Sequence, residues 1–117
     1  MKDLYNYKAT VVRVVDGDTA ELMIHLGFTI VWKSTCRFYG INTPELKSKD
    51  PEERAKAKEA RALVEQYLTP GAVVYIKSHE LDKYGRPLVT IHCGTEQEQI
   101  ILNNKLVELG LAKTYIL

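Results

Sequence analysis

The sequence contains few of the residues that build metal centres or disulfide frameworks. It has 2 cysteines and 3 histidines in 117 residues. Cys36 and Cys93 lie far apart, and His25, His79 and His92 form no i,i+4 pair. This spacing matches neither a zinc motif nor a disulfide scaffold. We therefore predict two small buried thiols in strands and no zinc site.

A strong net charge and a long apolar run are also missing. The chain has 16 Lys and Arg against 15 Asp and Glu, for a net charge of +1. Contact with a polyanion must therefore come from a local basic patch. No segment is long and apolar enough to predict a membrane span, and residues 1–6 lack the apolar core of a signal peptide. We expect no membrane partner and a cytoplasmic location, with a mature secreted form as the alternative.

The chain carries no internal repeat, low-complexity tract or Ser/Gly linker. Its hydrophobic content of 45% is enough for one core. We therefore predict a single domain over residues 1–117 and expect a monomer.

The first half of the chain has the residue pattern of strands. Residues 8–15 are rich in β-branched side chains, and residues 20–26 alternate between apolar and polar. Gly27 and Phe28 mark a turn before a third apolar segment over residues 30–39. These signals predict an antiparallel three-stranded meander. We expect the sheet to end at residue 40.

A helix is predicted next. Asp50 is a suitable N-cap, Pro51 suits the first helical position, and two glutamates follow in the first turn. The segment Thr69-Pro70-Gly71 ends the helix. Its apolar stripe has the spacing of a buried helix face: Ala60, Leu63, Val64, Tyr67 and Leu68.

The remaining elements complete a known order. Residues 73–76 and 88–92 are predicted strands, and residues 100–109 are a predicted helix that Gly110 stops. Five strands with a helix between the third and fourth and a C-terminal helix are typical of the OB-fold, a small Greek-key barrel. We therefore predict an α+β, mainly β, OB-fold.

Three polar clusters fall at the predicted strand ends. The first is the stretch VVDGDT at residues 14–19, where Asp16-Gly17 is an ordinary turn pair and its glycine suits positive φ. Asp18 is a second carboxylate that the turn does not require. The other clusters join Arg37 to residues 42–45 and occupy residues 82–86. Each alone is typical of a structural loop, but together they supply oxygen ligands, a spare carboxylate and two arginines. These are the groups that metal-assisted cleavage of a phosphodiester requires.

At these residues the sequence resembles the staphylococcal-nuclease (thermonuclease) family, from about Lys8 to Tyr115. The resemblance rests on VVDGDT, on Arg37 followed by Thr43-Pro44-Glu45, on Asp82-Lys83-Tyr84-Gly85-Arg86 and on Gly110-Leu111-Ala112-Lys113. It implies an OB-fold and a calcium-dependent nuclease that cuts single-stranded DNA and RNA and leaves 3′-phosphate ends.

The resemblance also implies a calcium site. Asp18 and the backbone carbonyl of Thr43 would be ligands, and calcium accepts such oxygens in loose geometry. Asp16 and Thr19 would lie behind the ligands and orient them. At Asn42 the family usually has aspartate, so this chain keeps an oxygen there but loses a charge.

The same resemblance assigns the chemistry to three residues. Glu45 would be the general base that takes a proton from the attacking water. Arg37 and Arg86 would hold the phosphate and stabilise the charge developing on its oxygens. The structural alternative for Arg37 is a strand residue that pairs with Glu45.

Three further residues would contact the nucleotide. Lys83 and Tyr84 would lie near a terminal phosphate, and Tyr115 would stack on a base, although a core position is the alternative for Tyr115. Loss of charge at Asn42 leaves a second hypothesis open for the whole chain. It would then be a weak or inactive nuclease-like OB module that binds single strands or a protein partner.

Overall fold

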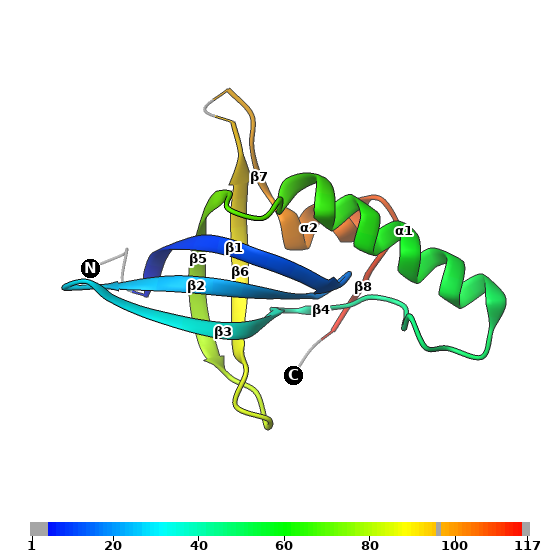
Figure 1. Cartoon of the computed structure of the whole chain (residues 1–117). Coiled ribbons are helices and arrows are strands. Elements are labelled where there is room, and N and C mark those ends of the chain that lie inside the picture. The colour runs from blue at the N-terminus through cyan, green and yellow to red at the C-terminus, as the bar shows by residue number, and fades with distance from the viewer. Residues whose placement is uncertain (1–4, 96, 116–117) are drawn as a thin grey trace.

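The computed structural model describes residues 5–95 and 97–115 (Figure 1). Strands β1 (Asn6–Asp16), β2 (Thr19–Gly27) and β3 (Ile30–Phe38) pair in sequence as an antiparallel meander. This confirms the three strands predicted from the alternation of apolar and polar residues.

Two further strands, each longer than predicted, close the sheet into a barrel. Strand β5 (Val73–Leu81) pairs with β1, and β6 (Pro87–Gly94) pairs with β5. Strand β6 then pairs in parallel with β3, Arg37 opposite Leu88 and Phe38 opposite Val89. These pairings make a closed five-stranded barrel and confirm the predicted OB-fold class.

Helix α1 (Pro51–Tyr67) begins and packs as the sequence predicts. Asp50 accepts a hydrogen bond from the Glu52 N–H at 3.0 Å, so it caps the first turn. The helix buries Ala57, Ala60 and Val64. Among residues 5–95 and 97–115, no helix is both long enough and apolar enough to span a membrane.

The C-terminal helix begins later than predicted. Residues Gln99–Ile101 form strand β7, which pairs with β6, and helix α2 covers Leu102–Glu108. Ile101 occupies the N-cap position and makes no side-chain capping bond. Pairing with β6 satisfies the backbone of residues 99–101, which the predicted helix would have left without a capped start.

The chain also returns to β structure where the sheet was expected to end. Strand β4 (Ile41–Asn42) pairs with β8 (Lys113–Thr114) in a separate two-stranded sheet. The sheet of the meander ends at Phe38, as expected, but the pairing of β4 with β8 was not predicted; it forms because the C-terminal segment returns beside the loop after β3 (Figure 1). This places Asn42 on a paired strand.

A buried amide ties this region together. Asn103 is 3% exposed, accepts the Ile91 N–H at 3.0 Å and donates to the carbonyls of Tyr39 and Val89 at 3.0 and 3.1 Å. Its side chain thus joins α2 to β6 and to the end of β3. Since a buried amide must be paired, we interpret Asn103 as a structural residue.

The two cysteines are free and buried, as predicted. Both lie in strands, Cys36 in β3 and Cys93 in β6. Burial raises the pKa of the Cys36 thiol to about 12 and that of Cys93 to about 11. Neither thiol is therefore a reactive nucleophile near neutral pH.

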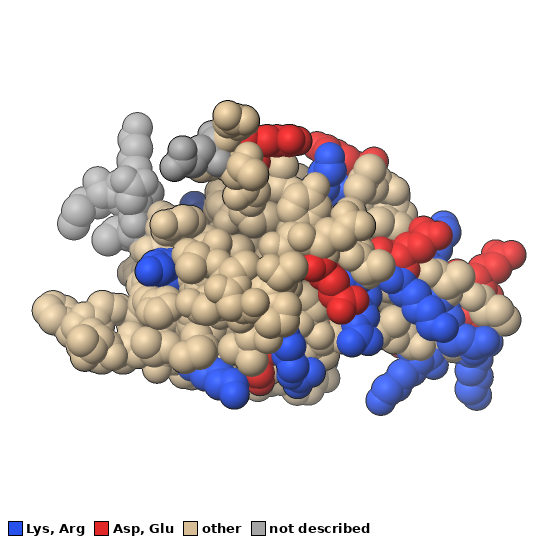
Figure 2. Space-filling model, turned by 45° about the horizontal axis from the view of Figure 1, so that its top comes forward, with Lys and Arg blue, Asp and Glu red and all other residues tan. Residues whose placement is uncertain are grey.

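The β2–β3 hairpin projects from the barrel. Phe28 at its tip is 96% exposed, and Leu26, Ile30 and Trp32 beside it are also exposed. In Figure 2 the projecting lobe on the left is almost free of charged side chains, whereas basic and acidic side chains gather on the right, where α1 lies.

Candidate active site

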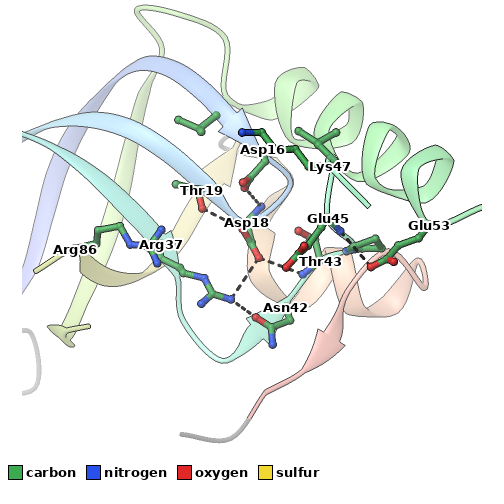
Figure 3. Close-up of a pocket in the computed structure, with 13 residues that line it drawn as sticks. Asp16, Asp18, Thr19, Arg37, Asn42, Thr43, Glu45, Lys47, Glu53 and Arg86 are labelled. Carbon is green, nitrogen blue, oxygen red and sulfur yellow. Dashed lines mark hydrogen bonds and ion pairs between the residues drawn. The ribbon is translucent and has the colours of Figure 1, made fainter. Parts of the chain in front are cut away.

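A cavity of about 710 Å³ opens at the end of the barrel where the β1–β2 turn, the end of β3 and the loop after β4 meet (Figure 3). Every residue predicted to bind metal or to act in catalysis lines it. The lining residues are Val15, Asp16, Asp18, Thr19, Arg37, Asn42, Thr43, Pro44, Glu45, Leu46, Lys47, Glu53 and Arg86. The sequence motifs therefore meet in space, although they lie far apart along the chain.

Gly17 brings the β1–β2 turn close to helix α1. A Cβ atom at this position would lie 2.8 Å from the Ala60 Cβ and 3.1 Å from the Thr43 Oγ1. Gly17 does not have positive φ, so the conformational reason predicted from the Asp-Gly pair was wrong. Glycine is required because three segments meet there with no room for a side chain.

Asp18 is the centre of the polar network. It is 9% exposed, and both of its carboxylate oxygens have partners. Oδ1 accepts the Thr19 hydroxyl at 3.0 Å, and Oδ2 accepts the Thr43 N–H at 3.2 Å. Arg37 makes an ion pair with Oδ2 at 3.4 Å. Asp18 therefore joins the turn, β3 and the loop after β4.

The two aspartates of the turn titrate in opposite directions. Burial raises the pKa of Asp16 to about 6, and the hydrogen bond to Asp18 and the negative charge of Asp18 act in the same direction. Burial would also raise the pKa of Asp18, but its bonds to Asp16, the Thr43 N–H, Arg37 and Thr19 outweigh burial and lower it. Asp18 is therefore the first of the pair to ionise, and Asp16 keeps its proton until the pH rises to about 6.

Arg37 connects the proposed metal ligands. Its guanidinium donates to the side-chain oxygen of Asn42 and to the Ile41 carbonyl at 3.3 Å, besides its ion pair with Asp18. Arg37 does not pair with Glu45, which was the structural alternative for this residue. The side-chain oxygen of Asn42 is thus directed toward Arg37 of β3.

The donor set around Asp18 consists of hard oxygens. The Asp18 carboxylate, the Asn42 amide oxygen and the Thr43 backbone are close together, and Asp16 bonds the Asp18 N–H at 3.1 Å. Such oxygens fit calcium, which also accepts water and substrate phosphate as ligands. Among residues 5–95 and 97–115, no three His, Cys, Asp or Glu side chains converge to hold a metal ion. The residues thus fit calcium through a set poor in carboxylates.

Glu45 is exposed at the mouth of the cavity, on the loop after β4. Within the described part of the chain, no hydrogen bond or ion pair holds its carboxylate, while its N–H donates to Glu53 at 3.5 Å. Glu53 also accepts the Ser48 hydroxyl at 2.5 Å. The sequence analysis missed this role of Glu53, which lies in the first turn of α1 and fixes the loop that carries Glu45 (Figure 3).

Arg86 reaches the cavity from the β5–β6 hairpin. Its Nε makes an ion pair with the Asp82 Oδ2 at 2.7 Å, and Asp82 Oδ1 accepts the N–H groups of Tyr84 and Arg86 at 2.8 and 2.9 Å. Burial would raise the pKa of Asp82, but these bonds and the charge of Arg86 outweigh it and lower the pKa. Asp82 therefore positions Arg86, a role that the sequence analysis did not assign.

The three predicted nucleotide contacts lie outside the cavity lining. Tyr84 is 72% exposed, with the Lys83 Nζ 5.2 Å and the Arg86 Cζ 5.5 Å from its ring centre. These cation–π contacts place Tyr84 next to a cavity residue. Tyr115 is 44% exposed, which argues against a core position, and its N–H bonds the Gly40 carbonyl at 2.8 Å.

Comparison with known proteins agrees with this geometry. The chain is 29% identical over 130 aligned positions to an uncharacterized protein of Methanocaldococcus jannaschii, an alignment that covers 95% of this chain. The chain spans 60% of that protein's length. The family model of staphylococcal nuclease homologues matches residues 35–117, most of the chain. With the closed barrel and the converging motifs, this match establishes that the chain belongs to the family of staphylococcal nuclease homologues.

Proposed function

We propose that this protein is a calcium-dependent nuclease that hydrolyses phosphodiester bonds of single-stranded DNA and RNA. The observation that carries the proposal is the convergence of Asp18, Arg37, Glu45 and Arg86 in one cavity. These side chains come from four separate segments of the chain. A fold that only binds nucleic acid has no need for this combination of a buried anion, an exposed carboxylate and two arginines.

The two arginines are the proposed phosphate clamp. Each guanidinium offers paired donors and stays protonated, so it can bind a phosphate before and during charge development. Arg37 is already fixed by Asp18 and Asn42, and Arg86 by Asp82. Fixed donors stabilise developing charge without first having to reorganise.

Glu45 is the proposed general base. Within the described residues its carboxylate makes no hydrogen bond or ion pair, so its lone pairs are available to a water molecule at the mouth of the cavity. A carboxylate is a weak base at neutral pH, so the reaction depends on the arginines to lower the barrier for attack.

Calcium would be held by Asp18, the Thr43 carbonyl and the Asn42 oxygen. When bound, the ion would supply Lewis-acid polarisation of a phosphate oxygen. Asp16 would support this arrangement through its bond to the Asp18 N–H.

Charge favours a short contact with the substrate. The net charge is +1, so binding depends on a local basic rim that includes Arg37 and Arg86. A rim of this size contacts few phosphates and predicts a shallow salt dependence. Single strands should be cut faster than duplexes, because their backbone can bend into the cavity.

The test is cleavage of a fluorescently labelled single-stranded DNA with calcium or with chelator. Calcium-dependent shortening of the oligonucleotide, with 3′-phosphate ends, supports the proposal. A protein with Glu45→Gln prepared in parallel shows whether the activity belongs to this cavity or to a contaminating nuclease. Equal cleavage by the two proteins, or none by either, would overturn the proposal.

One observation favours a second candidate function. The Asn42 oxygen bonds Arg37, and the neutral amide gives a cation less charge than a carboxylate would. If this loss of charge prevents calcium binding, the protein is a nuclease-like module that binds single strands without cutting them. Tight binding of an uncut oligonucleotide in the presence of calcium would support this second function.

A further inference from the structure

A pair of stacked rings lies at the seam that closes the barrel. The rings of Tyr39 and His79 are parallel within 7°, with centroids 3.7 Å apart. The His79 Nε2 is 2.7 Å from the Thr90 hydroxyl of β6, which fixes the imidazole. Tyr39 follows β3 and His79 lies on β5, so this ring platform of Tyr39 and His79 bridges the strand between them.

The ring platform faces solvent. Tyr39 remains 38% exposed despite the stacking, and His79 is exposed. Burial and the nearby charge of Lys77 lower the pKa of His79, while Glu80 acts in the opposite direction. The imidazole is therefore an uncharged ring near neutral pH, suited to stacking.

The outer face of the neighbouring strands continues the platform. Tyr75 and Lys77 precede His79 at alternate positions of β5 and are exposed, with Tyr75 at 60%. Lys8 of β1 lies directly opposite Tyr75 in the register, and it is exposed too. Four residues of strand extend about 13 Å, so the rings of Tyr75 and His79 are spaced along a track.

The lysines on this face have no acidic partner among the residues that the structure describes. Neither Lys8 nor Lys77 makes an ion pair with any described residue, whereas Arg13 and Lys33 both pair with Glu21 on the same meander. Closure of the barrel accounts for the stacking of Tyr39 on His79. It does not account for an exposed tyrosine between two lysines that form no ion pair with any described residue.

We propose that the outer face of β1, β5 and β6 binds single-stranded nucleic acid at a surface separate from the cavity. Bases would stack on Tyr75 and on the ring platform, and phosphates would contact Lys8 and Lys77. Exposed rings accept any unpaired base, and lysines beside them follow the backbone.

The position of this face favours the same strand that enters the cavity. Tyr39 is two residues beyond Arg37, and the carbonyl of the next residue, Gly40, bonds the N–H of Tyr115. The inference rests on the proposed function in taking nucleic acid as the ligand. It adds a second contact that holds the strand outside the cavity.

The test is the fluorescence anisotropy of a labelled oligothymidylate of twelve nucleotides, measured in chelator to prevent calcium-dependent cleavage. We expect Tyr75→Ala/Lys77→Ala to weaken binding at least about fivefold, the low end for one lost base stack. Each lysine removed should make the log–log salt slope shallower by about 0.7. Tyr39→Ala should weaken binding, and Tyr39→Phe should restore it because the ring is kept.

The matched control is Phe28→Ala/Lys58→Ala, which also removes one exposed ring and one exposed lysine but lies on the hairpin tip and on α1. It should bind like wild type. Equal binding by all variants, or a wild type that binds no oligonucleotide in chelator, would overturn the inference. If the Tyr75→Ala/Lys77→Ala protein loses binding and wild type does not cleave in calcium, the result would support this surface and refute the nuclease.

Thermal unfolding of each variant separates the two roles of the ring platform. A Tyr39→Phe protein that unfolds like wild type and binds like wild type supports the surface. A Tyr39→Ala protein that unfolds early but still binds the oligonucleotide would assign the rings to barrel closure alone and overturn the inference for that pair.

Discussion

The cavity end of the barrel and the β2–β3 hairpin are built on opposite principles. At the cavity, Asp18 is nearly buried and both of its oxygens are bonded. At the hairpin tip, Phe28 is an apolar side chain almost wholly in solvent. The buried polar atoms of Asp18 are thus held by hydrogen bonds, whereas the solvent-exposed apolar ring of Phe28 is not packed. The cavity end should therefore be sensitive to single substitutions and the hairpin tip tolerant of them.

The largest expected effect is on catalysis. Glu45→Gln and Arg86→Ala should each lower the cleavage rate at least about a hundredfold, the usual scale for loss of a base or of a charge-stabilising donor. Glu45 is exposed, so its variant should unfold at the wild-type temperature. Single-turnover kinetics measure the cleavage rate, and thermal unfolding measures the stability of each variant. Full activity in the two variants would show that the assigned chemistry is wrong.

Replacing a glycine with alanine should lower the stability more at the cavity end than in the β2–β3 hairpin. We expect Gly17→Ala to lower the free energy of unfolding by about 2 to 3 kcal/mol, because its Cβ would be 2.8 Å from the Ala60 Cβ. Gly27→Ala meets no atom within 4 Å, but its φ is +96°, so it should cost about 1 kcal/mol. Urea unfolding compares them.

Adding Ala60→Gly to Gly17→Ala should recover part of the loss, after allowing about 1 kcal/mol for glycine in a helix. Additive costs in this double-mutant cycle would contradict the close approach of the turn to α1.

Replacing Asn42 with aspartate restores a carboxylate at the proposed calcium site. An added charge beside a divalent ion, less its desolvation, should tighten calcium binding by roughly 1 to 3 kcal/mol, or about ten- to a hundredfold. Wild type should then need about millimolar calcium. Calorimetric titration of both proteins decides the point. Unchanged calcium affinity would mean that the side chain of residue 42 binds Arg37 and does not contact the cation.

Asp16 should make the metal-free protein less stable at neutral pH. Its pKa is raised from 3.8 to about 6, so its favourable contribution is complete below pH 3.8 and is lost as the pH rises through about 6. A shift of this size equals about 3 kcal/mol for a buried group. Solvent screening of a half-buried one leaves about 1 kcal/mol.

Asp16→Asn keeps an oxygen for the Asp18 N–H and removes the charge. In chelator it should therefore be more stable than wild type at pH 7.5, by about 1 kcal/mol, and equal to it at pH 3.5. Urea unfolding at the two pH values measures this. The same gain at both values would exclude ionisation as the cause.

The smallest effect is expected at the hairpin tip. Phe28→Ser should change the free energy of unfolding by less than about 0.5 kcal/mol, since the folded state leaves the ring 96% exposed. A loss above about 1 kcal/mol would show that the ring is covered in solution, and sedimentation would then reveal whether a second copy covers it.

The long elements were predictable because local signals and packing agree in them. The alternation in β2 and the Asp50-Pro51 start of α1 each correspond to an observed element. Strand β4 has two residues and thus no period to detect. Its pairing depends on where the C-terminal segment returns. The start of α2 was missed because Ile101 gives no capping signal, and its pairing with His92 of β6 is a tertiary contact.

The candidate site divides in the same way. The residue types that line the cavity were evident from VVDGDT and from the residues around Arg37 and Arg86. Their hydrogen-bond partners were not, because the bonds from Arg37 to Asn42 and from Ser48 to Glu53 depend on loop geometry. The steric role of Gly17 was also hidden, since Ala60 is far from it in sequence.

The seam between β3 and β6 has a consequence for the newly made chain. Arg37 lies opposite Thr19 of β2 on one side and Leu88 of β6 on the other, so its strand gains the second neighbour only after β6 has been synthesised and docked. Such distant pairings form late, because the intervening chain must first be ordered. For the proposed nuclease, an unfinished polypeptide at the ribosome would contain VVDGDT and Thr43-Pro44-Glu45 but would lack the β3–β6 pairing, so it would not yet cleave RNA.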